Sequence, residues 1–293
     1  YLRMPDETHE TMTAFEVAHV FCHDGAGGNP TGLVLDATTL STDDMQELAR
    51  RCGHESGFVL PPSEDDDADF RFRYFVPRHE MEMCGHATVG ALWLLRERGV
   101  IGDGVYRIAT SSGTVTGAVG ARVEITQPLG DVQNADRFRD DILGVLGIGR
   151  DALAEGAIEN ARTSRTKTLV PIANADILNA ITPDFAKVEE LCAALGSTGL
   201  YPYTALSVEQ GLFEARQFPR ASGYPEDAAT GIAATALASA LLGRGRIADP
   251  AAGITIYQGR AMGALSEIQV RFSRDQTTGS VGHCWIYGAV RIG

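Results

Sequence analysis

Alternating apolar and polar positions predict several strands in the first half of the chain. Phe70, Phe72 and Tyr74 alternate with Arg71 and Arg73, a pattern typical of a strand with one buried face. Gly and Asn residues before Pro30 predict a loop over residues 25–30. Apolar runs predict further strands over residues 15–21, 31–35, 58–60, 105–109, 114–119 and 123–126.

Helical spacing of apolar residues predicts helices between these strands. Ser41 is a suitable N-cap, Asp44 completes a capping-box pattern, and Gly53 can end the helix that they begin. Later in the chain, strands are expected near Ile254, Ile268 and Trp285. The same reasoning predicts helices over residues 88–98, 138–146, 185–195 and 230–242, and strands over residues 203–208 and 212–218.

Two segments half a chain apart resemble each other in kind. Residues 83–92 and residues 227–236 are both turns of small residues that open an apolar helix. They occupy the same place within each half of the chain, which favours an internal repeat. The pattern therefore predicts two similar lobes that face each other across a cleft.

Composition narrows the class of protein. The chain has 293 residues, 44% of them hydrophobic, and a formal net charge of −13, which argues against a nucleic-acid partner. No apolar run approaches the length of a membrane span, and residues 1–10 lack the apolar core of a signal peptide. Five scattered cysteines argue against a disulfide framework, so a reducing cytoplasm is expected.

Two features could carry chemistry. Residues 85–88 and 229–232 lie at expected helix N-termini, where unpaired backbone N–H groups can hold a carboxylate. The alternative is that these small residues only permit close helix packing. Glu55 lies between a helix end and an apolar strand, where the pKa of a carboxyl group can rise toward neutrality and suit proton transfer. The alternative is an exposed loop glutamate.

Four motifs together resemble one known family. Gly28-Asn29-Pro30, residues 54–59 (HESGFV), residues 84–90 (CGHATVG) and residues 226–231 (EDAATG) occur in the order and spacing of the PhzF-like isomerases of phenazine biosynthesis. The match extends over most of the chain, from about Phe15 to Ile292. On these motifs the chain is identified as a member of that family, which resembles diaminopimelate epimerase and proline racemase in fold.

The resemblance implies an α+β fold of two lobes, each a curved sheet around a central helix. The N-terminal lobe would cover residues 1–128, the C-terminal lobe residues 129–279, and the last strand, about 280–293, would return to the first lobe. Members of the family need no cofactor or metal, and they commonly form homodimers. The expected partner is therefore a small carboxylate or amino-acid substrate bound between the lobes.

The resemblance also assigns roles to single residues. Glu55 matches the glutamate that moves the proton, while His86 and Asp227 match residues that position the substrate and assist the transfer. Cys84 is a further catalytic candidate. The expected substrate-binding residues at the two helix starts are Gly85, Ala87, Thr88, Ala229, Thr230, Gly231 and Ile232.

Three departures from the family pattern bear on the substrate. Cys84 resembles the first catalytic cysteine of proline racemases, but Ala228 and Ala229 occupy the expected place of the second. A thiol at a helix start can act as a base, or Cys84 can be a small buried hydrophobe. Ile232 replaces a common serine, and residues 259–266 lack the usual arginine–proline pair. Both changes indicate altered substrate recognition.

Three functions remain open. The first is a cofactor-independent isomerase that shifts double bonds in specialised, antibiotic-type biosynthesis, acting on a dihydropyrrole carboxylate of an alkylproline pathway or a dihydro-hydroxyanthranilate-type substrate. The second is an epimerase that pairs Cys84 with Glu55 or Asp227. The third is a non-catalytic ligand-binding protein. The remaining histidines show no metal-ligand spacing: His19, His23, His79 and His283.

Overall fold

The computed structural model describes residues 14–275, 277 and 279–293, so the polar segment over residues 1–10 lies outside the described residues. The chain divides into two compact units. Unit 1 comprises the described residues up to Val20 together with Asn29–Thr126 and Tyr287–Gly293. Unit 2 comprises Phe21–Gly28 and Gln127–Ile286. The lobe boundaries and the cleft expected from the sequence stay predictions.

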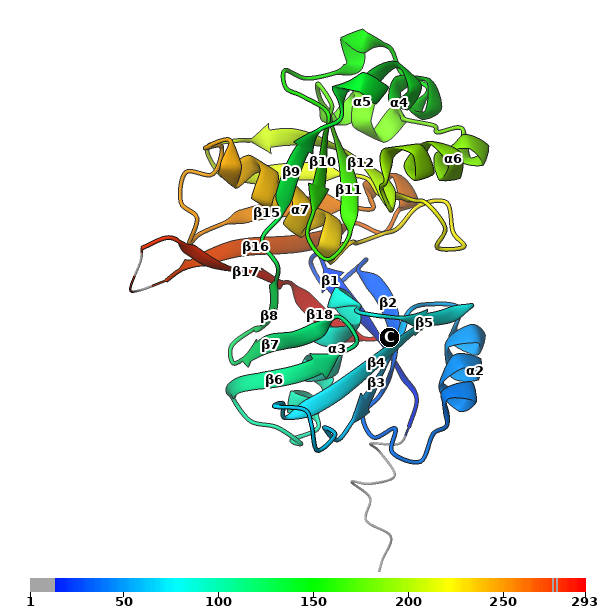
Figure 1. The fold of residues 1–293 in the computed structure, drawn as a ribbon, viewed down its shortest axis with the longest axis vertical. Coiled ribbons are helices and arrows are strands. Elements are labelled where there is room, and N and C mark those ends of the chain that lie inside the picture. Colours follow the sequence, from blue (N-terminus) through cyan, green and yellow to red (C-terminus); the bar gives the residue numbers. More distant parts are fainter. Residues whose placement is uncertain (1–13, 276, 278) are drawn as a thin grey trace, which may run out of the picture. The chain divides into compact units, whose positions relative to one another are not determined.

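Unit 1 is a mixed sheet with two helices (Figure 1). Strand β1 pairs antiparallel with β2, β2 runs parallel to β3, β3 is antiparallel to β4, and β4 runs parallel to β6. Helices α2 and α3 lie in the two parallel connections. The elements are β1 (Glu16–Cys22), β2 (Asn29–Val34), α2 (Thr42–Cys52), β3 (Ser56–Leu60), β4 (Phe70–Val76), β5 (His79–Met81), α3 (Gly85–Glu97), β6 (Gly104–Thr110), β7 (Gly113–Val119), β8 (Val123–Gln127) and β18 (Ala289–Ile292).

Unit 2 repeats this order of pairings. Strand β10 is antiparallel to β11, β11 runs parallel to β12, β12 is antiparallel to β13, and β13 runs parallel to β15. Helices again lie in the parallel connections, α5 and α6 in the first and α7 in the second. The elements are β9 (Asp131–Asn134), α4 (Arg139–Leu146), β10 (Glu159–Arg162), β11 (Thr166–Pro171), α5 (Ala175–Ala180), α6 (Phe185–Leu195), β12 (Gly199–Ser207), β13 (Leu212–Ala215), β14 (Phe218–Pro219), α7 (Gly231–Gly243), β15 (Ile254–Gln258), β16 (Ser266–Arg274) and β17 (Val281–Tyr287).

One helix in each unit is buried almost entirely. Helix α3 packs against β2, β3 and β7, and helix α7 packs against β9, β10, β11 and β16. Nearly every residue of both helices is buried, so neither has a polar face. The internal repeat expected from the two small-residue segments is therefore seen as a shared topology around a buried helix.

Local signals in the sequence predicted most elements. The capping box is present, because the Asp44 backbone N–H donates to the Ser41 hydroxyl and Asp44 accepts from the Ser41 N–H. The helix expected over residues 88–98 was placed too late, because α3 begins at Gly85. Strands β9, β10 and β11 and helix α5 were missed, because these short segments have little apolar periodicity of their own.

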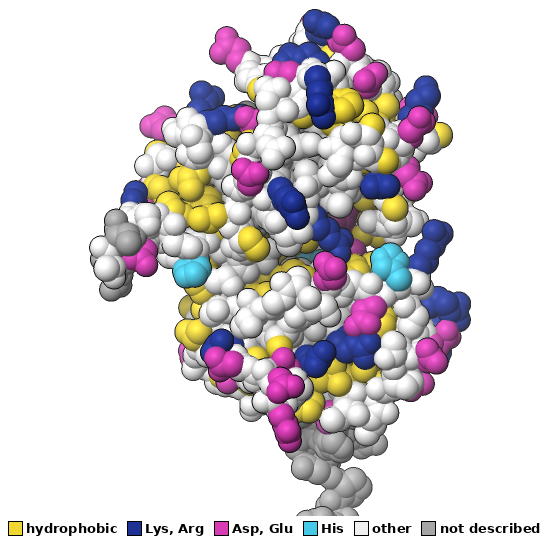
Figure 2. Space-filling view, viewed as in Figure 1, with side chains coloured by type: hydrophobic (Ala, Val, Ile, Leu, Met, Phe, Trp, Pro, Cys, Tyr) yellow, Lys and Arg dark blue, Asp and Glu magenta, His cyan; other side chains and the backbone are white. Residues whose placement is uncertain are grey.

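The surface is mixed in charge. On the face shown in Figure 2, Lys and Arg side chains are interspersed with Asp and Glu side chains in each unit. None of the helices in the described part of the chain combines the length and apolar character that crossing a bilayer requires. All five cysteines are free thiols.

The loop after β1 depends on glycine at one position. Gly27 has φ +62°, and a Cβ there would lie 1.9 Å from the backbone oxygen of Leu265. Gly25 also has a positive φ, +75°, but a Cβ there would meet nothing within 4 Å. A side chain at position 25 would therefore meet backbone strain alone, whereas a side chain at position 27 would meet both strain and a steric collision.

We expect Gly27→Ala to lower the free energy of unfolding by about 3 kcal/mol, because strain and collision add. Gly25→Ala is the matched control, and its cost is expected to be about 1 kcal/mol, from strain alone. Urea unfolding of both variants measures the difference. Equal costs would show that the contact with Leu265 does not constrain this loop.

Candidate active site

Backbone contacts with β2 hold Glu55 at the start of β3. Its carbonyl oxygen accepts hydrogen bonds from the Gly32 N–H (3.1 Å) and the Thr31 hydroxyl (2.9 Å). Its side chain is 12% exposed, so the carboxyl group is largely withdrawn from water. The alternative of an exposed loop glutamate is therefore wrong.

His86 joins Glu55 and Cys84 in one buried group. The imidazole Nε2 lies 3.9 Å from Glu55 Oε2, and the other ring nitrogen, Nδ1, lies 3.3 Å from Cys84 Sγ. The His86 side chain is only 7% exposed. The structure thus brings together a thiol, an imidazole and a carboxyl group at the first turn of α3.

Burial decides the charge of His86. Desolvation lowers its pKa, and this effect outweighs both the neighbouring Glu55 carboxylate and a hydrogen bond to the Pro30 carbonyl, which raise it. The imidazole is therefore neutral near pH 7 and can both donate and accept a hydrogen bond. The contact with Pro30 gives the Gly28-Asn29-Pro30 motif, whose last two residues begin β2, a role that the sequence did not reveal.

The other expected residues of this helix start have partners within unit 1. The Thr88 hydroxyl donates to the Cys84 carbonyl (2.7 Å) and pairs with the Tyr74 hydroxyl (2.7 Å). The Ala87 methyl group lies 3.3 Å from where a Cβ on Gly57 would stand, so the strand and the helix touch. Both residues pack the helix against the sheet, and their contact with substrate stays a prediction, as does that of Gly85.

Asp227 lies on the segment that leads into α7 in unit 2. Its N–H donates to the Gln217 carbonyl (3.0 Å), and its carboxylate accepts a hydrogen bond from the Thr230 hydroxyl. Glu226 next to it forms a buried, bidentate ion pair with Arg216 (2.8 and 2.7 Å). These contacts hold the segment on both sides of Asp227. No motif or spacing in the sequence pointed to Arg216 as part of this region.

The other residues of the second helix start are close-packed. A Cβ on Gly231 would lie 2.8 Å from the end of the Ile286 side chain, so a larger residue there would have to displace that side chain. Ala229 is fully buried and Ile232 is half-buried. These contacts agree with the packing alternative for the small residues, and their role in binding stays a prediction.

The two helix starts correspond residue by residue. Cys84 and Thr230 are both N-caps in extended conformation, and their carbonyls accept from the amides of Thr88 and Ala234 at 3.0 Å each. Thr230 is therefore the counterpart of Cys84, and the placement at Ala228 and Ala229 was wrong by one or two residues. Either way, the second position has no thiol.

The expected residues thus form two groups. Glu55, His86 and Cys84 meet in unit 1, whereas Asp227 and Thr230 meet in unit 2. Among the residues that the structure describes, no three His, Cys, Asp or Glu side chains form a group suited to a metal ion. Of the other histidines, His23 contacts Glu267 through Nδ1 at 2.8 Å.

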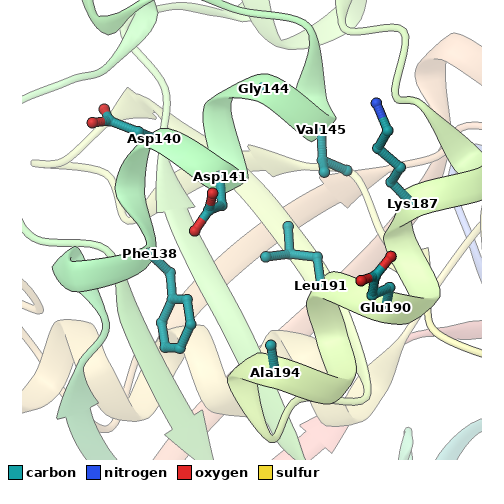
Figure 3. Close-up of a pocket in the computed structure, with 9 residues that line it drawn as sticks. All are labelled: Phe138, Asp140, Asp141, Gly144, Val145, Lys187, Glu190, Leu191 and Ala194. Carbon is teal, nitrogen blue, oxygen red and sulfur yellow. The ribbon is translucent and has the colours of Figure 1, made fainter.

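A separate hollow of about 460 Å³ lies between α4 and α6 of unit 2 (Figure 3). Its charged side chains are exposed, and two of them have ion-pair partners, since Asp140 pairs with Arg150 and Lys187 pairs with Asp184. It contains none of the expected site residues. Its lining is Phe138, Asp140, Asp141, Gly144, Val145, Lys187, Glu190, Leu191 and Ala194.

Comparison with known proteins agrees with the four motifs. The profile of the family described as phenazine biosynthesis-like protein matches residues 18–282. An uncharacterized isomerase of Deinococcus radiodurans is 32% identical over 272 residues, covering 88% of this chain and 86% of that protein. A Bacillus anthracis phenazine biosynthesis protein of the PhzF family superposes with a TM-score of 0.80 at 24% identity, over 95% of this chain and 96% of that one.

A more distant structure has the same fold. A hydroxyproline epimerase from Agrobacterium vitis, solved with trans-4-hydroxy-L-proline bound, has a TM-score of 0.58 and 14% identity, over 95% of this chain and 90% of that one. At this identity the likeness concerns the fold alone. The expected relation to the fold of proline racemases is confirmed.

The lowered pKa of His86 predicts a loss of stability in mild acid. The unfolded chain binds a proton at about pH 6.5, whereas folded His86 binds it only at lower pH, so protonation favours unfolding. Below about pH 6.5 this residue should cost about 1 kcal/mol for each pH unit, until the folded pKa is reached. Urea unfolding between pH 5.5 and 7.5 measures it.

In His86→Asn, this part of the pH dependence should vanish. His79→Asn, at an exposed position, is the control and should keep the wild-type slope. A His86→Asn variant with the wild-type slope would contradict the neutral, buried imidazole.

Proposed function

The chain belongs to the phenazine biosynthesis-like protein family, and we propose that its reaction shifts a double bond by proton transfer on a small cyclic unsaturated amino acid or carboxylate. Isomerase activity is supported by three curated relatives that are named uncharacterized isomerases. This chain matches each of them over most of its length. The observation that carries the proposal is the withdrawn carboxyl group of Glu55, 3.9 Å from a neutral imidazole.

The proposed reaction is a proton shuttle. The Glu55 carboxylate removes a proton from one carbon, and the electron pair of that C–H bond moves into the conjugated system of the substrate. The carboxylic acid so formed returns the proton to a second carbon, and the double bond ends in a new position. No electrons leave the substrate, so the reaction requires no oxidant, reductant or cofactor.

Neighbouring groups assist the shuttle. Neutral His86 offers a hydrogen bond to the charge that develops on the substrate without competing with Glu55 for the proton. We assign Asp227 of unit 2 to the substrate as well, in the positioning role that the family resemblance implies. The unpaired amides of the two helix starts would then hold the substrate carboxylate.

Two substrate types suit this reaction, a dihydropyrrole carboxylate and a dihydro-hydroxyanthranilate. The isoleucine at position 232 stands where a serine is common, and the thiol at position 84 stands where the family often has a small residue, so both helix starts differ from the family pattern. That change favours the smaller dihydropyrrole carboxylate. Such a substrate would place the enzyme in specialised biosynthesis.

A one-cysteine epimerase is the second candidate. The observation in its favour is the contact of Cys84 Sγ with His86 Nδ1 at 3.3 Å, since an adjacent imidazole can accept the proton of a thiol. An epimerase inverts one carbon and leaves the ultraviolet spectrum unchanged, whereas a double-bond shift alters it. The two reactions are therefore distinguishable in one experiment.

We expect Glu55→Gln to lower kcat at least about 1,000-fold, because glutamine cannot accept the proton. The assay incubates the enzyme in heavy water with a dihydropyrrole carboxylate, a dihydro-hydroxyanthranilate or trans-4-hydroxy-L-proline. Deuterium entry and the ultraviolet spectrum are followed together. Cys84→Ala should lower the rate less than tenfold if the thiol only packs.

Glu64→Gln, in an exposed turn of the same unit, is the matched control and should behave as wild type. Full deuterium incorporation by Glu55→Gln would refute the shuttle. Inversion without a spectral change, abolished by Cys84→Ala, would establish the epimerase instead. Tight binding with neither deuterium entry nor a spectral change would indicate a ligand-binding protein.

A further inference from the structure

A chain of hydrogen bonds leads to Asp227 from deep inside unit 2. The Tyr201 hydroxyl donates to Gln258 Oε1 (3.1 Å), and Gln258 Nε2 donates to the Thr230 hydroxyl oxygen (3.2 Å). The Thr230 hydroxyl in turn donates to Asp227 Oδ2. We call Tyr201, Gln258, Thr230 and Asp227 the Asp227 relay; Tyr201 and Gln258 are completely buried.

The direction of each bond in the relay is fixed by its chemistry. Gln258 Nε2 also lies 2.8 Å from the Asp227 carbonyl oxygen, which can only accept, so this end of the amide must be the NH₂ group. Gln258 Oε1 must therefore accept from Tyr201. Burial, followed by the charge of Asp227, raises the pKa of Tyr201, so its phenol remains a donor.

The same direction continues through Thr230. Its hydroxyl oxygen receives the amide N–H of Gln258, which leaves the single hydroxyl proton to be donated to Asp227. The relay thus ends in a donor that faces the carboxylate. Every donated proton points toward Asp227, and none of the three supporting groups titrates near neutral pH.

The backbone beside Gln258 is shaped for this contact. Gly259 has φ +84°, and a Cβ there would lie 2.9 Å from the Ala228 carbonyl and 2.4 Å from the Ala264 carbonyl. Only glycine lets the end of β15 pass this close to the segment that leads into α7. Gln258 and Gly259 together seat the segment that contains Asp227.

We propose that Gln258 and Tyr201 are positioning residues that act through Thr230 to hold the Asp227 carboxylate as a fixed hydrogen-bond acceptor. The proposal rests on the proposed function, in which Asp227 faces the substrate. An acceptor in this place selects a substrate group that donates, such as an ammonium or iminium N–H. The relay thus specifies an amino-acid substrate rather than a dicarboxylate.

The relay is tested first without any ligand, by ¹³C NMR titration of the carboxyl groups in Asp-labelled protein. Gln258→Met removes the amide at similar volume, and the titration midpoint of Asp227 should rise by about one pH unit, since the carboxylate loses a well-held donor. Tyr201→Phe should raise it by less. Unchanged midpoints in both variants would overturn the relay.

Tyr203→Phe is the matched control. Tyr203 lies on the same strand and is also buried, but its hydroxyl accepts from Arg244 (3.1 Å) rather than contacting Gln258. Its removal should leave the titration of Asp227 at the wild-type midpoint. An equal shift in Tyr203→Phe would attribute the effect to general loosening of β12 and would also overturn the proposal.

Activity measurements then distinguish a failure of the positioning role of Gln258 from a failure of the proposed function. On the compound turned over in the heavy-water assay, Gln258→Met should lower kcat about 10- to 100-fold and move the acid limb of the rate profile upward with the NMR midpoint. An NMR shift with unchanged kcat would overturn the positioning role. If no compound of the panel shows deuterium entry or a spectral change, the proposed function fails, whereas the NMR titration still decides the relay.

Discussion

Two helices without a polar face constrain the whole architecture. Helices α3 and α7 are buried along nearly their entire length, so each must be wrapped by the sheet of its own unit. Inside such a helix every backbone group has a partner, except in the first and last turns. The helix starts are therefore the places where the interior offers backbone donors, and Glu55 and Asp227 each lie near one of them.

The two units treat these acidic groups differently. In unit 1 the neighbour of Glu55 is an imidazole that burial keeps neutral, so it can offer a hydrogen bond without taking up the proton. In unit 2 the Asp227 carboxylate accepts from the Thr230 hydroxyl, which does not titrate near neutral pH and which accepts in turn from the Gln258 amide. This contrast suits a division of labour in which one carboxyl group moves the proton and the other holds the substrate.

Capping motifs and apolar spacing predicted those elements whose formation depends on residues close together in the sequence. The capping box of Ser41 and the helix over residues 185–195 follow from spacing alone, and the structure has both. The motifs located Glu55 and His86, and burial then supplied the reason for their chemistry. The early start of α3 was missed because Gly85 and His86 are weak helix formers, held in the helix by tertiary packing.

The residues that sequence reasoning missed act across long separations. Tyr201 and Gln258 are 57 positions apart, and their hydrogen bond exists only because β12 and β15 both flank β13. Arg216 likewise reaches back to carbonyls near residues 178–181, which belong to the end of α5. No periodicity or short motif reports such contacts, since they follow from the order of strands in the sheet.

The correspondence of Cys84 with Thr230 bears on the choice between isomerase and epimerase. A two-base epimerase needs an acceptor of protons at each helix start. Thr230 cannot serve, because its only proton is directed at Asp227 and its oxygen already accepts from Gln258. The Asp227 carboxylate accepts that bond through Oδ2, and our proposal assigns it to a substrate N–H rather than to proton removal. The reaction that we propose therefore assigns proton removal to the group in unit 1, with Glu55 as the side chain that takes the proton and gives it back.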